Sequence, residues 1–365
     1  MKILEITVAH RSDDTRIYHK YIKSLLDAGF EVGYMAPQPI ISGAANLKLF
    51  CLKKSKSLIL RLFGLLKMLP AIRSYNPNWI HLHDPELLLV SPLLRFLGYK
   101  LIYDMHENFY RELDDKPISW VSICSQKLVW RLIEKYILKK TPVVFAEQSY
   151  AKCFDLEAGT LVVQNFPKEA NVIERFQPKA VERSKGKFVY LGTISKDRGA
   201  LKMIRVLDKA FGELDYELHF IGDITNPVLE RELMSIFAHR SNVIFHGYQP
   251  LYDAWRICKE CDVGLAILDP KENYIESYPT KLFEYLVCGL PVVTSNFELY
   301  KDLIERYGLG LCIDPNKEVD IASALIEIMD ARQYSQFASC VESFPFHEFT
   351  WEREFEKFEA YLRTA

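Results

Sequence analysis

Four residues that could bind a charged ligand stand close together in the stretch "ESYPTKLFEYLVCGLPVVTS". Glu276 precedes a turn, Thr280 and Lys281 follow Pro279, and Glu284 comes one helical turn later. Pro279 suits the first position of a helix, where its missing N–H has no partner to lose. The first turn of a helix offers unpaired N–H groups and the positive end of the helix dipole, so it can bind an anion. The stretch therefore predicts an anion site at the start of a short helix.

The order of these groups matches the order of groups in a sugar nucleotide. Lys281 adds a full charge to the anion site, and Glu284 shares a helix face with it, while Glu276 lies on the other side of the anion site. A carboxylate accepts hydrogen bonds well from the neighbouring hydroxyls of a sugar or a ribose. The alternative is an ordinary amphipathic helix with solvated charges. This alternative is less favoured because "GLPVVTS" follows the helix directly and because the helix begins after an expected strand.

Short apolar runs alternate with helix-length patterns along the whole chain. Strands separated by helices indicate parallel sheets built from βαβ units. Two series of such strands flank a charged segment, "FPKEANVIERFQPKAVERSKGK", which we interpret as a linker. The fold class expected is therefore α/β, with two doubly wound, Rossmann-like domains. The expected strands are "KILEITV", "EVGYMA", "NWIHLH", "KLIYDM", "PVVFAE" and "TLVVQN", then "KFVYLG", "YELHFIG", "NVIFHG", "DVGLAIL", "PVVTS" and "LGLCID".

Candidate binding residues follow the expected strands. Open α/β sheets bind ligands at the carboxyl ends of their strands, so we expect one cleft between the two domains to collect these residues. They are His10 to Arg16, His83 to Glu86, His106 to Asn108, Gly192 to Gly199, Gly222 to Asp223, and Glu276 to Glu284.

The composition limits the function classes. The formal net charge is −2, which does not favour nucleic-acid binding. The scattered cysteines suit a reducing cytoplasm, and we expect Cys258 and Cys261 to be buried structural residues. No long apolar run predicts a membrane-spanning helix. The basic, apolar stretch from Leu52 to Tyr75 fits either a helix that covers the first domain or peripheral contact with the inner face of a membrane.

The second half of the chain resembles the Glu-x7-Glu signature of retaining glycosyltransferases of family 4, the "group 1" set with the GT-B fold. The resemblance is carried by "ESYPTKLFEYLVCGLPVVTS", "FVYLGTISKDRGALKMI" and "HFIGD", and in the first half by "HDPELLLVSPLL" and "IYDMHEN". It implies an acceptor-side domain at residues 1–166, a donor-side domain at 167–344, and a final helix at 345–365 that crosses back to the first domain.

The resemblance also implies roles for individual residues. Glu276 would hold the donor sugar and Glu284 the ribose, Arg198 and Lys281 would clamp the diphosphate, and His106 would reach the donor sugar. The remaining donor-side residues would be Thr280, Gly192, Thr193, Gly222 and Asp223.

The sequence departs from the family at two places. The family usually has an Arg after the first glycine of the second domain and a later Lys-Gly; here Gly192 precedes Thr193, and Arg198 precedes Gly199. We expect Lys281 to supply the missing charge. In addition, "AHRSDDTRIYHK" stands where many family members have a glycine-rich first loop, so the family pattern does not identify the acceptor side. The acceptor-side candidates are His10, Asp14, Arg16, His83, Asp84 and Glu107. Helix capping is the alternative role for Asp13 or Asp14 and for Asp84.

The predicted function is transfer of a sugar, with retention, from a UDP-, GDP- or TDP-linked donor to a hydroxyl, in an enzyme of the hexosyltransferase type. We expect the acceptor to be a saccharide or lipid-linked saccharide of surface polysaccharide synthesis. No Asp-x-Asp occurs in the chain, so neither a metal nor another cofactor is expected. The alternatives are a nucleotide-sugar epimerase of similar fold and a non-catalytic sugar-binding or scaffold subunit.

Overall fold

The computed structural model describes residues 1–37, 46–53, 55, 58–106, 120–152, 154, 156, 159–169, 185–213, 215–224 and 226–365. Glu107 and most of the predicted linker lie outside these ranges. The chain divides into two compact units. The first consists of Met1–Lys168 together with Thr350–Ala365, and the second of Glu169–Phe349.

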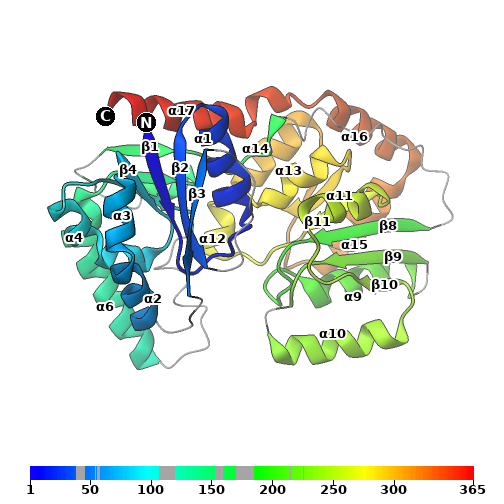
Figure 1. The fold of residues 1–365 in the computed structure, drawn as a ribbon. Coiled ribbons are helices and arrows are strands. Elements are labelled where there is room, and N and C mark those ends of the chain that lie inside the picture. Colours follow the sequence, from blue (N-terminus) through cyan, green and yellow to red (C-terminus); the bar gives the residue numbers. More distant parts are fainter. Residues whose placement is uncertain are drawn as a thin grey trace. The chain divides into compact units, whose positions relative to one another are not determined.

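The first unit contains a parallel sheet with strand order β3-β2-β1-β4-β5-β6-β7 (Figure 1). All six predicted strands of this half are present, and each pairs in parallel with its neighbours. β3 was not predicted, because "LKLFCL" is short and basic at its second position. The strands are β1 (Lys2–Ile6), β2 (Glu31–Pro37), β3 (Leu47–Leu52), β4 (Trp79–Leu82), β5 (Lys100–Met105), β6 (Val143–Phe145) and β7 (Thr160–Val162).

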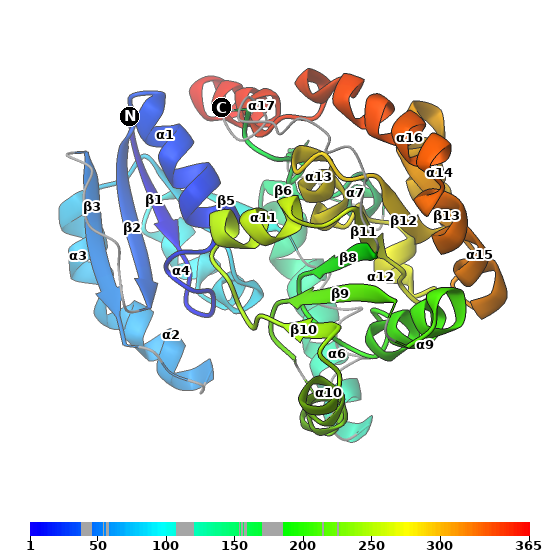
Figure 2. The ribbon, with the colours of Figure 1, turned by 90° about the vertical axis from the view of Figure 1, so that its right-hand side faces the viewer.

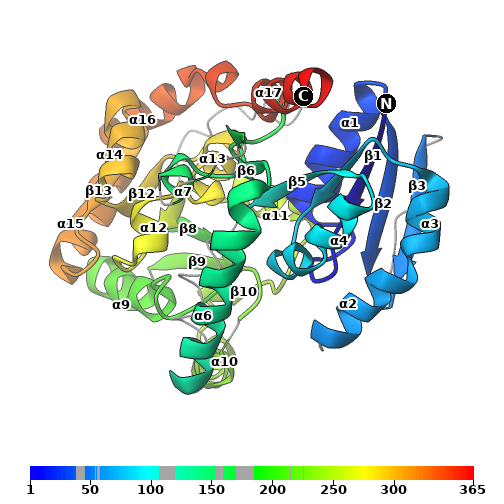
Figure 3. The same cartoon turned by 90° about the vertical axis from the view of Figure 1, so that its left-hand side faces the viewer.

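Helices cover both faces of this sheet, because its strands are apolar on both sides (Figures 1 and 3). Leu4 of β1 belongs to one core cluster and Ile3 to the other, as the alternation of side chains requires. One face packs against α2 (Leu58–Lys67), α3 (Leu69–Tyr75), η2 (Pro85–Leu89), α4 (Ser91–Phe96) and α6 (Trp120–Tyr136). The other packs against η1 (Thr15–Ile22), α1 (Lys23–Asp27) and α17 (Trp351–Thr364).

The second unit contains a parallel sheet with strand order β10-β9-β8-β11-β12-β13 (Figure 2). All its strands were predicted: β8 (Gly186–Leu191), β9 (Tyr216–Ile221), β10 (Val243–Phe245), β11 (Val263–Ala266), β12 (Val292–Ser295) and β13 (Gly310–Ile313). The strand order reverses direction between β8 and β11, which is where such sheets bind ligands. Two doubly wound parallel sheets confirm the predicted fold class.

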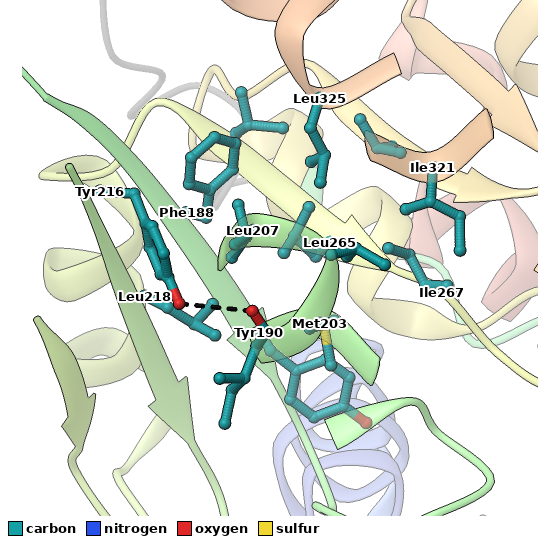
Figure 4. Close-up of a cluster of buried hydrophobic side chains, with 14 of the residues drawn as sticks. Phe188, Tyr190, Met203, Leu207, Tyr216, Leu218, Leu265, Ile267, Ile321 and Leu325 are labelled. Carbon is teal, nitrogen blue, oxygen red and sulfur yellow. Dashed lines mark hydrogen bonds between the residues drawn. The ribbon is translucent and has the colours of Figure 1, made fainter. Parts of the chain in front are cut away.

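The helices of the second unit follow its strands. Met203 and Leu207 of α9 pack beside Phe188 and Leu265 in the core (Figure 4). The helices are α9 (Ala200–Phe211), α10 (Pro227–His239), α11 (Leu251–Lys259), α12 (Glu272–Ile275), α13 (Thr280–Val287), α14 (Glu298–Tyr307), α15 (Glu318–Met329) and α16 (Ala331–Ser343).

Helix α13 is shorter than the sequence suggested. Pro279 is its N-cap and not its first helical residue, and no side chain caps its first turn. Gly289 follows the helix with φ +80°, a conformation that glycine adopts without strain. The uncapped first turn carries Thr280 and Lys281, the residues of the predicted anion site.

Candidate functional site

The loops after β8 and β9 approach each other so closely that only glycine fits. Gly222 has φ +140°, and a Cβ on it would lie 2.1 Å from the carbonyl oxygen of Gly192. Gly192, at φ +112°, donates its N–H to the oxygen of Ile221 at 2.8 Å. Because glycine has no side chain, the backbone after β8 and β9 is accessible. In α/β folds such a backbone allows a phosphate to bind next to the main chain.

The amine of Lys281 is buried next to this loop. Its side chain is 6% exposed, and its Nζ has no hydrogen-bond partner within the described ranges. Burial and the nearby charge of Arg198 hold the pKa of Lys281 well below its usual range, although Glu284 opposes the shift. The Nζ of Lys281 lies 3.7 Å from the ring centroid of Tyr190. A Cβ built on Gly192 would lie 3.6 Å from the same Nζ. A bound anion would satisfy this amine.

Arg198 is held in place by an aromatic neighbour. Its Nε donates to the hydroxyl of Tyr274 at 3.3 Å, and its guanidinium lies 5.5 Å from that ring's centroid. The Tyr274 hydroxyl in turn hydrogen-bonds Asp197. Gly199 follows with φ +76°, where a Cβ would lie 2.4 Å from the oxygen of Ile267. The tight packing of Gly199 and the hydroxyl of Tyr274 therefore fix the guanidinium at the start of α9.

The other donor-side candidates lie on the same elements. Glu276 is half-buried at the end of α12, Thr280 is exposed at the first position of α13, and Glu284 is half-buried one turn further. Thr193 accepts a hydrogen bond at its carbonyl from Tyr190, at 2.7 Å, and Asp223 is exposed. The structure thus brings Arg198, Lys281 and the Gly192 loop together and places the glutamates before and within α13.

The first unit carries a polar layer inside its sheet. Glu5 and His81 are directly opposite each other on β1 and β4, and Asp104 lies on the neighbouring β5. Each occupies the same sheet face as the apolar residue two positions earlier, under η1 and α17. All three side chains are completely buried, so each needs a compensating partner.

Asp104 is the centre of this network. Arg16 binds it with two parallel hydrogen bonds, from Nε at 2.9 Å and from Nη2 at 2.7 Å. His83 places Nδ1 3.3 Å from Asp104 and Nε2 2.5 Å from Glu5. Because both ring nitrogens of His83 face carboxylates, the ring is held as a cation. Two carboxylates and two cations therefore neutralise one another away from solvent.

The pKa values of the network follow from these contacts. Burial by itself would raise the pKa of Glu5, but the charges and hydrogen bonds of His81 and His83 lower it to about 2. Burial would lower the pKa of His83, but hydrogen bonds to Asp104 and Glu5 raise it to about 9. At neutral pH, Glu5 is therefore ionised and His83 is protonated, and their charges oppose each other.

The network reaches solvent through His10 and His106. Their Nε2 atoms lie 3.1 Å apart, and their side chains are 23% and 15% exposed. Asp84 lies 2.6 Å from Nδ1 of His10 and accepts from the N–H of Val8 at 2.6 Å. Asp84 thus orients the His10 ring through Nδ1, while Nε2 of His10 faces Nε2 of His106. Nδ1 of His106 lies 3.2 Å from Asp104.

Two acceptor-side candidates have structural roles, and the capping alternative fails for a third. Asp14 caps η1 by accepting from the N–H groups of Arg16 and Ile17, so the capping alternative holds for Asp14. Arg16 is 4% exposed and its guanidinium is committed to Asp104, so it is not available to an acceptor. Asp84 makes no capping hydrogen bond, so the capping alternative fails for it.

Several residues of these sites were missed from the sequence. Glu5 and Asp104 interrupt apolar strand patterns, in "KILEITV" and "KLIYDM", and this interruption was the available signal. His81 carries the same signal in "NWIHLH". Tyr190 and Tyr274 gave none, because an aromatic residue in a strand or helix is usually core.

Two groups of described residues bring potential metal ligands within 4.8 Å of one another, Glu5–His81–His83 and His83–Asp104–His106. Arg16 already occupies Asp104 with two hydrogen bonds, and His83 already neutralises Glu5. We therefore assign no metal to this network, and the expectation of no cofactor stays a prediction.

The chain is similar to known proteins in sequence over its second half and in fold over its whole length. Residues 172–339 match the family described as Glycosyl transferases group 1. A search of curated protein sequences finds no match. Solved structures similar to the whole chain include sucrose-phosphate synthase from Thermosynechococcus elongatus, at 16% identity, 99% coverage of this chain, 98% of that chain and TM-score 0.76. HepE of Anabaena in complex with UDP-glucose matches at 15%, with 100% of both chains covered and TM-score 0.71. WaaG, a glycosyltransferase involved in lipopolysaccharide biosynthesis, matches at 12%, with 98% and 99% covered and TM-score 0.70.

These similarities show the fold and the class of the protein. The whole-chain structural matches show the GT-B fold. The family match shows that the second unit carries a glycosyl transferases group 1 domain, so the protein is a glycosyltransferase. No helix among the described residues is long and apolar enough to cross a bilayer.

Proposed function

We propose that the protein transfers a sugar, with retention of anomeric configuration, from a nucleoside diphosphate sugar to a hydroxyl of a saccharide or lipid-linked saccharide. The main support for the donor part of this proposal is the environment of Lys281. Its amine is more than nine-tenths buried and has no hydrogen-bond partner among the described residues, and it lies near the guanidinium of Arg198 and the Gly192 loop. This combination supports binding of a diphosphate here.

The donor contacts follow from the elements that hold each side chain. Lys281, Arg198 and the first turn of α13 bind the two phosphates and stabilise the charge that develops when the sugar leaves. Glu284 accepts from the ribose hydroxyls, and Glu276 accepts from hydroxyls of the sugar. UDP is our first choice of donor nucleotide, because solved structures of this fold include complexes with UDP and UDP-glucose.

The acceptor contacts are assigned to the first unit. We propose that His10, oriented by Asp84, contacts the acceptor hydroxyl, and that His106 contacts the donor sugar. Among the described residues of this network, His10 and His106 keep 23% and 15% of their side chains exposed, whereas Asp84 and Asp104 are fully buried. Surface polysaccharide synthesis as the process and the lipid-linked form of the acceptor rest on the family resemblance alone.

The first test is thermal unfolding of the protein with UDP, GDP and TDP and with their sugars. A ligand that binds only the folded state must raise Tm. We expect one nucleotide diphosphate to do so clearly. If none raises Tm in the wild type, the donor assignment is wrong.

The second test separates a transferase from an epimerase or a scaffold. The stabilising donor is incubated alone and with saccharide acceptors, and products are followed by proton NMR. We expect an unchanged or slowly hydrolysed sugar without acceptor, and a retained anomer with acceptor. Interconversion of the sugar without acceptor would support the epimerase. Glu276→Gln should abolish transfer while leaving the Tm increase by the free nucleoside diphosphate in place.

A further inference from the structure

The outer side of one helix layer in the first unit concentrates exposed apolar side chains. We call it the α4–α6 face, and Figure 3 shows its helices. Phe96 is 87% exposed, and Leu128, Leu132 and Tyr136 of α6 are 59%, 50% and 61% exposed. The apolar members are Phe63, Leu66, Leu89, Leu93, Phe96, Leu97, Leu128, Val129, Leu132 and Tyr136. Isolated exposed apolar residues are common, but a group of this size on one layer is a feature of binding surfaces.

The helices that carry these residues form one continuous layer. Leu65 of α2, Leu94 of α4, and Trp130 and Ile133 of α6 share a single core cluster on the same face of the sheet. Arg95 of α4 also donates to the backbone oxygens that follow α6, at 3.1 and 3.3 Å. Since their inner sides face the same side of the sheet, the exposed apolar positions lie on the outer side of that helix layer.

The same surface is strongly basic. Within residues 63–75, 85–99 and 123–141 there are eight basic side chains and two acidic ones, whereas the whole chain has a net charge of −2. The basic residues are Lys67, Arg73, Arg95, Lys127, Arg131, Lys135, Lys139 and Lys140, and the acidic ones are Glu86 and Glu134.

Helix α6 arranges the two kinds of side chain in neighbouring stripes. Arg131 and Lys135 are four residues apart, and so are Leu128 and Leu132, so each pair lines one side of the helix. All four are exposed. A basic stripe beside an apolar one is the pattern of helices that lie in a membrane interface, where the apolar side chains enter the bilayer and the cations meet lipid phosphates.

We propose that the α4–α6 face docks on an anionic lipid surface. The positive charge of this face disfavours a second copy of the chain as its partner, because a symmetric dimer would place two basic faces against each other. Of the stretch from Leu52 to Tyr75, only Phe63, Leu66, Lys67 and Arg73 contribute described side chains to the face. The larger contribution comes from η2, α4 and α6. The inference goes beyond the proposed function, since lipid binding requires neither donor nor acceptor.

The test is flotation of the full-length protein with vesicles of phosphatidylcholine and with vesicles containing an equal part of phosphatidylglycerol. We expect binding to the anionic vesicles that weakens with added salt. Two double variants, Leu128→Ser with Leu132→Ser and Arg131→Glu with Lys135→Glu, should each reduce partitioning by about tenfold or more. Tm with and without UDP shows that each variant is folded and, separately, that the donor site is intact.

The matched control is Val319→Ser with Ile326→Ser in α15 of the second unit, where the two side chains are 61% and 52% exposed. This variant should partition like the wild type. Equal binding to both vesicle types, or an equal loss in the control variant, would overturn the proposal. So would a vesicle-free dimer, seen by light scattering, that the Leu128 and Leu132 substitutions abolish.

Discussion

Replacing Lys281 with methionine should change stability and donor binding in opposite directions. The Nζ is buried, has no hydrogen-bond partner among the described residues, and lies against the Tyr190 ring. An unsatisfied buried polar group costs about 1–3 kcal/mol. Methionine retains the aliphatic stem and its contact with the ring, so Lys281→Met should stabilise the ligand-free protein. For a domain of this size the gain corresponds to a rise in Tm of about 2–12 °C.

The same substitution removes a cation from the proposed diphosphate site. A hydrogen bond to a charged group contributes about 1.5–3 kcal/mol, so the affinity for UDP, or for whichever nucleoside diphosphate binds, should fall by about 10- to 150-fold. Lys209→Met serves as the control, because Lys209 is exposed on α9. It should change neither quantity appreciably.

Isothermal titration calorimetry provides a second measurement of the same idea. Burial and the charge of Arg198 hold the pKa of Lys281 well below its usual range in the ligand-free protein. A diphosphate would raise that pKa, so binding should take up protons at pH values between the two pKa values. The uptake is measured by repeating the titration in buffers of different ionisation enthalpy. If Lys281→Met lowers Tm and also leaves nucleotide affinity unchanged, Lys281 is a packing residue and the reasoning fails.

Three further predictions concern the buried network and the glycine loop. Asp104→Asn should destabilise the protein by about 3–5 kcal/mol in denaturant unfolding, because it leaves buried cations without their carboxylate. The pKa of Glu5 falls from 4.5 to about 2 and that of His83 rises from 6.5 to about 9. Their contribution to stability should therefore be complete between pH 4.5 and 6.5, fall as pH drops toward 2, and fall as pH rises through 9, as followed by Tm. Gly222→Ala should abolish the nucleotide-induced rise in Tm, whereas Gly64→Ala in α2, where a Cβ meets nothing within 4 Å, should retain it.

Each of these predictions has an outcome that contradicts it. A loss below about 1 kcal/mol for Asp104→Asn would mean that the network is solvated, as surface ion pairs are. A Tm that stays flat from acid to alkaline pH would show that Glu5 and His83 keep ordinary pKa values. Normal nucleotide binding by Gly222→Ala would show that the loops after β8 and β9 adjust to a side chain, and that their close approach does not serve the ligand.

The predicted part of the fold came from local patterns. Apolar runs such as "DVGLAIL" and "PVVTS" identify buried parallel strands by themselves, since side chains on both faces must be apolar. The candidate donor residues were also predictable, because Arg198, Lys281 and the glycines follow strands, and the carboxyl ends of parallel strands share one edge of the sheet. Strand β3 was missed because its pattern is short, and the start of α13 was displaced by one residue.

The sequence by itself determined the fold class and the neighbourhood of the donor residues, because both depend on side-chain alternation and on the direction of parallel strands. Only the tertiary structure decided how charges are matched. It joined Glu5 and Asp104, from separate strands, with Arg16 and His83 into one network in which the charges balance. It also left Lys281 buried without a hydrogen-bond partner among the described residues, and set the apolar stripe of α6 outward. Such pairings depend on which distant segments meet, and on whether a partner atom lies within hydrogen-bond reach.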